Sequence, residues 1–196
     1  MAVKKIAPAR PRLLTVAEWA QLPDGDQYEL IDGLLRQRMV NQNRHEYTVG
    51  RAAQILNNHL DDAEVAGSVL GSNTKYEVRP RQGIMPDLSV VLSPKVDQLD
   101  AKAAYNAFGP DLAVEILSPD QGEEYVKERL GDYWALGTAE VWVVDPEAET
   151  VVGYGRGSAE FEVFARARGD QEFRSRLLPE LSFPVNRLWM RGMGGR

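Results

Sequence analysis

The sequence predicts an α/β fold in which a sheet with flanking helices carries a β-rich periphery. Two segments, 45–62 and 119–136, place apolar residues at the spacing of amphipathic helices. Three short runs, 87–92, 111–117 and 140–144, are apolar and rich in β-branched residues, as buried strands are. Helices and buried strands that alternate along the chain in this way are typical of an α/β sheet.

Local signals predict a short helix and a hairpin near the N-terminus. Thr15 and Glu18 form a capping-box pattern, and the helix that it opens is expected to run through Leu22. Residues 28–40 predict a hairpin, because the dipeptide Asp32-Gly33 accepts the positive φ angles of a type I′ turn.

The segments between and after the long helices predict strands, loops and breaks. Residues 67–71 are expected to be a break, 75–79 a strand followed by a Pro/Gly turn, and 93–110 a loop that holds a turn of helix. Strand meanders with glycine turns are expected at 150–164 and 173–188.

The length of 196 residues fits a single domain, for which we expect the bounds 13–189. Residues 1–12 are rich in Lys, Arg and Pro and predict a disordered basic tail, and 190–196 predict a flexible C-terminal tail. The start lacks the apolar segment of a signal peptide, and no apolar run reaches the ~18 residues of a spanning helix. We therefore expect a cytoplasmic protein with no membrane partner.

Composition excludes several kinds of site. The chain has no cysteine, which excludes disulfides, thiolate zinc sites and a cysteine nucleophile, and its two histidines cannot build a three-histidine metal centre. Carboxylates are then the main candidate metal ligands. The formal net charge of −6 argues against an indiscriminate coat for nucleic acid, although it leaves room for a locally basic cleft.

Two acids lie inside apolar strand segments, where an ionised carboxylate is costly unless it is paired or bound to a metal. Asp87 opens one run directly after Pro86, and Glu115 lies within another. Asp87 alone would fit a cap at a strand end, and Glu115 alone would fit a partner of an arginine or a solvated strand face. Together, near the ends of neighbouring strands, they predict a site for Mg²⁺ or Mn²⁺, which prefer hard oxygen ligands.

These acids also carry a family resemblance. Pro86-Asp87, followed by Glu115-Ile116-Leu117 within residues 110–119, resembles the pattern of the PD-(D/E)XK restriction-endonuclease-like superfamily, and within it the bacterial Uma-two family. The resemblance covers roughly residues 13–189. Further segments that resemble the family are Tyr28–Gly33, His45, Tyr133, Gly137, Val141–Pro146 and Leu177–Pro184.

The resemblance implies a restriction-endonuclease-like αβββαβ core, a mixed central sheet flanked by helices, with an extra N-terminal hairpin and a C-terminal β meander. It implies that Asp87 and Glu115 bind a divalent cation, Mg²⁺ or Mn²⁺, beside the backbone carbonyl of Ile116. Glu29 matches a characteristic acid of the family and either lines the same site or pairs outside it. His45 either lines the site or is a satisfied, half-buried histidine of the first core helix.

The basic position of the site departs from the superfamily pattern, because two residues after Glu115 the chain has Leu117. In the family that the chain resembles, the lysine lies on the next helix, four residues before a tyrosine, and this position is Arg129. The lysine of this stretch is Lys127. At about 100° per residue, Arg129 falls inside the apolar arc of the helix, whereas Lys127 falls beyond its edge, roughly 160° away. We favour Arg129, since a buried basic side chain needs an acidic partner, and we keep Lys127 as the alternative. The apolar arc consists of Tyr125, Val126, Leu130, Tyr133, Trp134 and Leu136.

The resemblance implies a metal-dependent endonuclease that hydrolyses phosphodiester bonds of DNA. Arginine stays protonated, so with Arg129 in place of lysine the activation of water would fall to the metal or to Glu29. The same departure fits a catalytically silent nucleic-acid-binding or accessory protein on this fold. An interaction protein with no nucleic-acid role is a third hypothesis, which only the acidic charge favours.

DNA is the expected partner, with binding that is weak and strongly dependent on salt because the net charge is negative. A homodimer is consistent with an enzyme that cuts both strands, since two active sites are then needed. Seven basic residues are suited to phosphate contacts, and none of them stands out: Arg36, Arg38, Arg44, Arg51, Lys75, Arg79 and Arg81.

Overall fold

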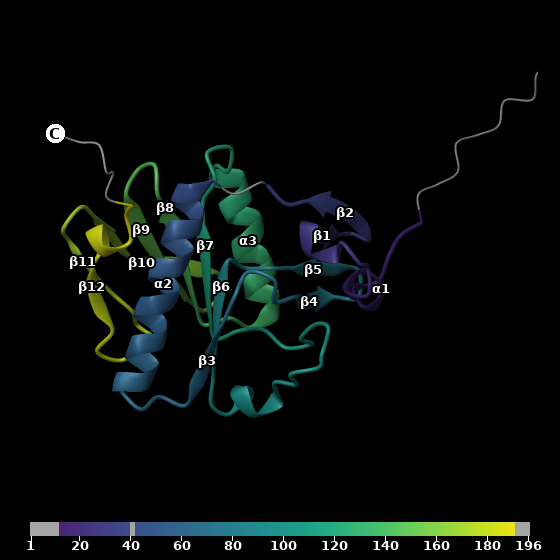
Figure 1. Cartoon of the computed structure of the whole chain (residues 1–196), viewed down its shortest axis with the longest axis horizontal. Helices are drawn as coiled ribbons and strands as arrows, with labels where there is room; N and C mark the ends of the chain where they lie inside the picture. Colours follow the sequence, from purple (N-terminus) through teal and green to yellow (C-terminus); the bar gives the residue numbers. More distant parts are fainter. Residues whose placement is uncertain (1–11, 40–41, 191–196) are drawn as a thin grey trace, which may run out of the picture.

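A six-stranded mixed sheet lies at the centre of the molecule (Figure 1). Its spatial order is β10 (Phe161–Arg168), β9 (Thr150–Arg156), β8 (Glu140–Asp145), β7 (Leu112–Ile116), β6 (Leu88–Leu92) and β3 (Gly67–Leu70). β7 and β8 run parallel, and the other neighbouring pairs of this sheet are antiparallel. The connection from β7 to β8 is the helix α3 (Glu123–Leu136), as a parallel pair requires.

The computed structural model describes residues 12–39 and 42–190. The predicted tails, 1–12 and 190–196, therefore lie outside the described residues except for Arg12 and Met190. Within the described ranges, no helix is both long and apolar enough to cross a membrane.

The two long helices cover opposite faces of the central sheet. α2 (Asn43–Asp62) packs on one face together with the small hairpin of β11 (Glu172–Arg174) and β12 (Ser182–Pro184). The helix α3 packs on the other face. The predicted αβββαβ core is confirmed, as the series α2, β3, β6, β7, α3 and β8.

A second sheet of four strands lies beside the core (Figure 1). Its order is β2 (Leu34–Gln37), β1 (Tyr28–Ile31), β5 (Gln82–Ile84) and β4 (Tyr76–Arg79). The short helix α1 (Val16–Ala20) and the 3₁₀ turn η1 (Gly25–Gln27) precede it. This sheet brings the N-terminal hairpin to the end of the central sheet at which the predicted acids lie.

Local signals at the N-terminus gave correct predictions. Thr15 and Glu18 form the reciprocal capping box of α1, which ends at Ala20, two residues before the expected end. Asp32 and Gly33 have φ angles of 50° and 84°, so the hairpin turns as predicted. The loop after β6 contains the expected helical turn, η2 (Lys95–Gln98), and a further turn, η3 (Val185–Arg187), follows β12.

Two predictions were wrong because glycines were taken as signals of breaks and turns. Residues 67–70 form β3, which pairs with β6, and residues 82–84 form β5 rather than part of a turn. A Cβ atom on Gly67 would lie 2.8 Å from Leu92 Cδ2, and one on Gly83 would lie 2.4 Å from Trp19 Cζ3. Each glycine thus permits a close approach within a strand.

The long helices also differ in their first residues from the sequence prediction. α2 begins at Asn43 rather than at His45, and α3 begins at Glu123 rather than at residue 119. Residues 118–121 form a separate turn, in which the N–H of Ser118 donates to Gln121 Oε1 at 2.9 Å. α3 ends as expected, with Gly137 in the left-handed conformation at a φ of 77°.

Candidate active site

The pleat of the central sheet determines where the two predicted metal-binding acids lie. Along β7, Leu112, Val114 and Ile116 pack on the α2 side, so Glu115 faces α3. Leu88 of β6 pairs with Val114, and one step further along the two antiparallel strands brings Asp87 next to Glu115. The period of two residues thus brings both carboxylates together at the end of neighbouring strands.

Asp87 is buried and held by three groups. Its Oδ2 accepts a hydrogen bond from the N–H of Ile116 at 2.8 Å and lies 3.3 Å from His45 Nε2. Its Oδ1 lies 3.9 Å from the guanidinium of Arg38. Burial lowers the pKa of His45, but the carboxylate of Asp87 outweighs this effect, and the pKa is raised overall. The half-buried histidine of the sequence analysis is therefore a buried neighbour of the candidate site.

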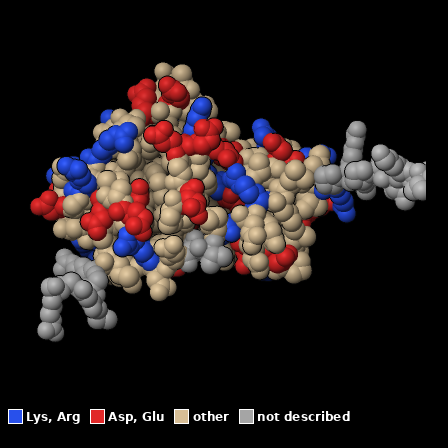
Figure 2. Space-filling model, turned by 90° about the horizontal axis from the view of Figure 1, so that it is seen from above, with Lys and Arg blue, Asp and Glu red and all other residues tan. Residues whose placement is uncertain are grey.

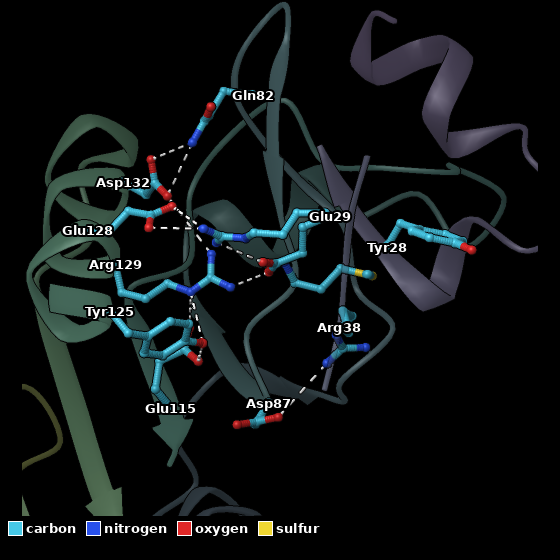
Figure 3. Close-up of polar contacts among 12 residues, drawn as sticks. Tyr28, Glu29, Arg38, Gln82, Asp87, Glu115, Tyr125, Glu128, Arg129 and Asp132 are labelled. Atoms are coloured by element: carbon cyan, nitrogen blue, oxygen red, sulfur yellow. Dashed lines mark hydrogen bonds and ion pairs between the residues drawn. The ribbon is translucent and has the colours of Figure 1, made fainter. Parts of the chain in front are cut away.

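Glu115 is buried among donors from α3 (Figure 3). Tyr125 Oη donates to Glu115 Oε2 at 2.9 Å, Tyr133 Oη donates a short hydrogen bond to Oε1, and Arg129 Nε lies 3.4 Å from Oε1. Burial raises the pKa of Glu115 to about 7, with the charge of Asp87 adding to the effect and Arg129 opposing it. Burial and the charge of Glu115 raise the pKa values of both tyrosines, so the hydroxyls stay protonated and donate.

Arg129 is buried between two acids and is only 3% exposed. Its Nη2 donates a short hydrogen bond to Glu29 Oε1, and its Nε donates to Tyr125 Oη at 3.0 Å (Figure 3). Burial opposes the charged form, but Glu29 and then Glu115 raise the pKa of Arg129, so it remains a cation. Arg129 of α3 therefore contacts both Glu115 and Glu29. Glu29 precedes Arg129 by 100 residues in the sequence.

Glu29 lines the site from the second sheet and is not a surface acid of the hairpin. It is 4% exposed, and its Oε1 also accepts from the N–H of Met85 at 3.2 Å. Burial raises the pKa of Glu29, but the charge and hydrogen bond of Arg129 outweigh it, and the pKa is lowered overall. Arg36 adds a contact of 3.3 Å to Glu29 Oε2. Glu29 is thus an ionised partner of Arg129.

The carboxylates open into a cleft of about 230 Å³. It lies at the end of the molecule where α2 and α3 begin and β7 ends, the end that Figure 2 views from above. Acidic and basic side chains of the described residues are interspersed over this face (Figure 2). The cleft is lined by Glu29, Arg36, Gln37, Arg38, Met39, His45, Met85, Asp87, Glu115, Ile116, Ser118, Asp120, Gln121, Tyr125 and Arg129.

Lys127, the alternative basic residue, does not line this cleft. It is exposed and lies along a separate cleft of about 700 Å³ between α3 and the strands β8 to β10. Gln121 lines both clefts, so the N-terminal end of α3 separates them. Arg129 and Lys127 therefore point in different directions from α3, as the helical arc predicted.

Sequence analysis missed three side chains of the site. Tyr125 and Tyr133 were counted as apolar members of the helix arc, although a tyrosine facing a buried acid is also a donor. Arg38 was one of seven basic residues without distinction, because its contact with Asp87 crosses from the second sheet to the central one. The two tyrosines could have been recognised as hydrogen-bond donors from the sequence, whereas the contact of Arg38 with Asp87 depends on how the two sheets pack.

The donor set fits a hard divalent cation. Asp87 and Glu115 would supply carboxylate oxygens and Ile116, which lines the cleft, would supply its backbone carbonyl, and Mg²⁺ keeps several waters beside so few protein ligands. The raised pKa of Glu115 reflects, besides burial, the nearby negative charge of Asp87, which a cation between the two acids would offset. The described residues contain no group of three or more Asp, Glu or His side chains arranged to hold a metal. Waters would therefore have to complete the coordination.

We expect the metal-free protein to lose stability as the pH rises from about 4.5 to about 7. The pKa of Glu115 is raised on folding to about 7, so the folded state holds a proton in this range that the unfolded state releases. With EDTA present, the free energy of unfolding from urea titrations should fall by about 2–3 kcal/mol over this range. In Glu115→Gln this part of the decline should vanish, and an equal decline in the variant would contradict the assignment.

Comparisons with known proteins agree with the fold and identify the family. A sequence profile of the family described as "Uma2: Putative restriction endonuclease" matches residues 16–186. A similar solved structure is the crystal structure of "a putative nuclease belonging to DUF820" from Anabaena variabilis ATCC 29413. It is 24% identical, with a TM-score of 0.72 over 89% of this chain and 97% of that one, which shows a shared fold. No curated protein matches the chain at a significant level.

Proposed function

Because the chain belongs to the Uma2 family, we propose that it is a metal-dependent endonuclease that hydrolyses phosphodiester bonds of DNA. The observation that carries this proposal is the cleft in which Asp87 and Glu115 meet beside the buried cation Arg129. Paired carboxylates on neighbouring strands next to a fixed positive charge suit a reaction in which negative charge builds up on a phosphate.

Asp87, Glu115 and the carbonyl of Ile116 would hold Mg²⁺ or Mn²⁺. When bound, such a cation lowers the pKa of a water molecule and stabilises charge on the phosphoryl oxygens. The N–H of Ile116 and His45 Nε2 fix the orientation of Asp87, and the two tyrosine hydroxyls fix that of Glu115. These contacts hold both carboxylates in fixed orientations at the cleft.

Arg129 contributes charge and position in the proposed reaction and cannot act as a base. Its guanidinium keeps Glu29 ionised and offsets part of the negative charge around Glu115. Glu29 is engaged by Arg129, Arg36 and the N–H of Met85, and its lowered pKa makes it a poor proton acceptor. Of the two sources of water activation that the sequence left open, the contacts of Glu29 favour the metal.

We expect the purified chain to nick plasmid DNA with Mg²⁺ or Mn²⁺ and not with EDTA. Asp87→Asn and Glu115→Gln should each lower the nicking rate about a hundredfold, because a metal at such a site contributes several kcal/mol to the transition state. Lys127→Ala, on the same helix but outside the cleft, is the matched control and should cleave as the unmodified chain does. Circular dichroism checks that each variant is folded.

Two outcomes would contradict parts of this proposal. If Lys127→Ala abolishes nicking and Arg129→Lys does not alter it, the basic position belongs to Lys127. If the chain binds DNA without cleaving it under any of these metal conditions, the second candidate, a silent nucleic-acid-binding protein, is favoured. The observation in favour of that candidate is that the basic residue beside Glu115 is an arginine bound to Glu29, which cannot act as a base.

For cleavage of both strands we propose a homodimer, which supplies one site for each strand. Light scattering with and without a DNA duplex tests this assembly. A chain that stays monomeric while it linearises plasmid in a single encounter would contradict it.

A further inference from the structure

We infer that Arg38 binds the substrate phosphate, and that it contacts Asp87 only until a divalent cation takes its place. The inference rests on the proposed function, because it names the residue that would hold the DNA backbone at that site. It singles out one of the seven basic residues that the sequence left equivalent.

The backbone of Arg38 is fixed while its side chain is loosely held. The N–H of Arg38 donates to the carbonyl of Gln27 at 2.8 Å, which anchors the residue just beyond β2. Its side chain, 19% exposed, extends over the cleft towards Asp87, at 3.9 Å from Oδ1 (Figure 3). A second contact, to the carbonyl of Asp26, has a length of 3.5 Å. Both contacts are at the long limit for such interactions, so most of the guanidinium donors remain available to a ligand.

The other two arginines of the cleft are firmly engaged. Arg36 donates to both carboxylate oxygens of Glu128 at 2.7 and 2.9 Å, and Arg129 is buried between Glu29 and Glu115. Moving Arg129 would leave two buried acids without their partner, and moving Arg36 would break two hydrogen bonds to Glu128 and a contact with the buried Glu29. Among the described residues that line the cleft, Arg38 is therefore the arginine that can turn to a phosphate at little cost.

Repulsion between the metal ion and Arg38 determines the order in which the metal and the phosphate bind. Arg38 offsets part of the charge of Asp87, and a divalent cation bound to the same carboxylate repels the guanidinium. Once repelled, the guanidinium lacks an acidic partner and is free for a phosphate oxygen, to which arginine donates two parallel hydrogen bonds. Arg38 thus opposes binding of the metal and favours binding of DNA.

We therefore expect Arg38→Ala to strengthen metal binding and to weaken DNA binding. Without DNA, Mn²⁺ measured by titration calorimetry should bind about fivefold more tightly, because a competing positive charge is gone. With Ca²⁺, which takes the same hard oxygen ligands, a labelled DNA duplex followed by anisotropy should bind about tenfold more weakly. The slope of log Kd against log salt concentration should fall by about one, as expected for one lost phosphate contact.

Arg79→Ala is the matched control, since it removes the same charge from the same four-stranded sheet. Arg79 is bound to Asp32 at 2.8 Å, its side chain is 61% exposed, and it does not line the cleft. Arg38→Lys keeps the charge and should keep the salt slope while binding DNA less tightly than arginine does. A merely structural role for Arg38 would weaken both Mn²⁺ and DNA binding, in contrast to the opposite signs expected here.

The inference is wrong if Arg38→Ala matches Arg79→Ala in its DNA affinity and salt slope, or if it binds Mn²⁺ less tightly than the unmodified chain. Failure of the proposed function gives a different result. In that case the unmodified chain does not nick DNA with either metal, or Asp87→Asn binds Mn²⁺ and nicks DNA as the unmodified chain does. If Asp87→Asn loses both while Arg38→Ala changes neither affinity, only the role of Arg38 fails.

Discussion

Arg129→Ala is expected to lower the free energy of unfolding by about 3–5 kcal/mol, the usual result of removing one member of a buried ionic network. Glu29 and Glu115 are 4% and 3% exposed and share this guanidinium as their nearest buried cation. Without it, both carboxylates lose a charge partner in a poorly solvated site, and Tyr125 loses a donor to its hydroxyl. Urea denaturation at pH 7, followed by circular dichroism, measures the loss.

Two comparisons separate the network from a general effect of shortening α3. Lys127→Ala removes an exposed cation of the same helix and should change the unfolding free energy by no more than about 0.5 kcal/mol. The double variant Glu29→Leu and Arg129→Met should recover part of the stability lost in Arg129→Ala, since the buried charges are removed together. An Arg129→Ala protein as stable as Lys127→Ala would show that water replaces the guanidinium without cost.

Glu140→Ala is expected to lower the free energy of unfolding by about 3–4 kcal/mol. This acid of β8 is 1% exposed, and it accepts four hydrogen bonds on the face of the sheet opposite to α3. Each donor left without a partner in the interior costs about 1–3 kcal/mol, with some relief from entering water. The donors are Trp142 Nε1 at 2.6 Å, Ser175 Oγ at 2.8 Å, the N–H of Arg176 at 2.9 Å and the N–H of Leu177 at 2.8 Å.

Three of these contacts, from Ser175, Arg176 and Leu177, connect the segment after β11 to the central sheet, and the fourth comes from Trp142 itself, so the variant should also change the surroundings of Trp142. The ring of Trp142 packs edge-on against Phe173 at a centroid distance of 5.1 Å, and a shift in its fluorescence should accompany the loss of stability. Glu162→Ala on β10 removes an exposed acid of the same sheet and serves as the control. A Glu140→Ala protein no less stable than Glu162→Ala would contradict the anchoring role.

Sequence alone predicted the elements whose signals are local. The capping box of Thr15 and the turn at Asp32-Gly33 formed as expected, because each depends on residues within a few positions. Gly67 and Gly83 misled the prediction for the opposite reason. Each is a glycine because a distant side chain, of Leu92 or Trp19, packs where a Cβ would lie, and that side chain is not recognisable in a local window.

The sequence predicted those residues of the site that are charged but lie within an otherwise apolar pattern. That argument found Glu115 in its strand and placed Arg129 on the buried face of its helix, where the structure has both. Applied to Glu140, the first residue of an equally apolar strand, the same argument would have indicated a third buried acid. It could not select Arg38, whose position depends on the packing of two sheets and not on a periodic pattern.

The pairing of Glu29 with Arg129 also affects how the chain is made. Glu29 of the hairpin is synthesised 100 residues before its cation. Until α3 has been made, the hairpin presents an ionised acid that would be costly to bury, so its final docking has to wait for the second half of the chain. Completion of the candidate cleft is thereby linked to completion of synthesis, and a nascent fragment that ends before Arg129 has Glu29, Asp87 and Glu115 but lacks their buried arginine.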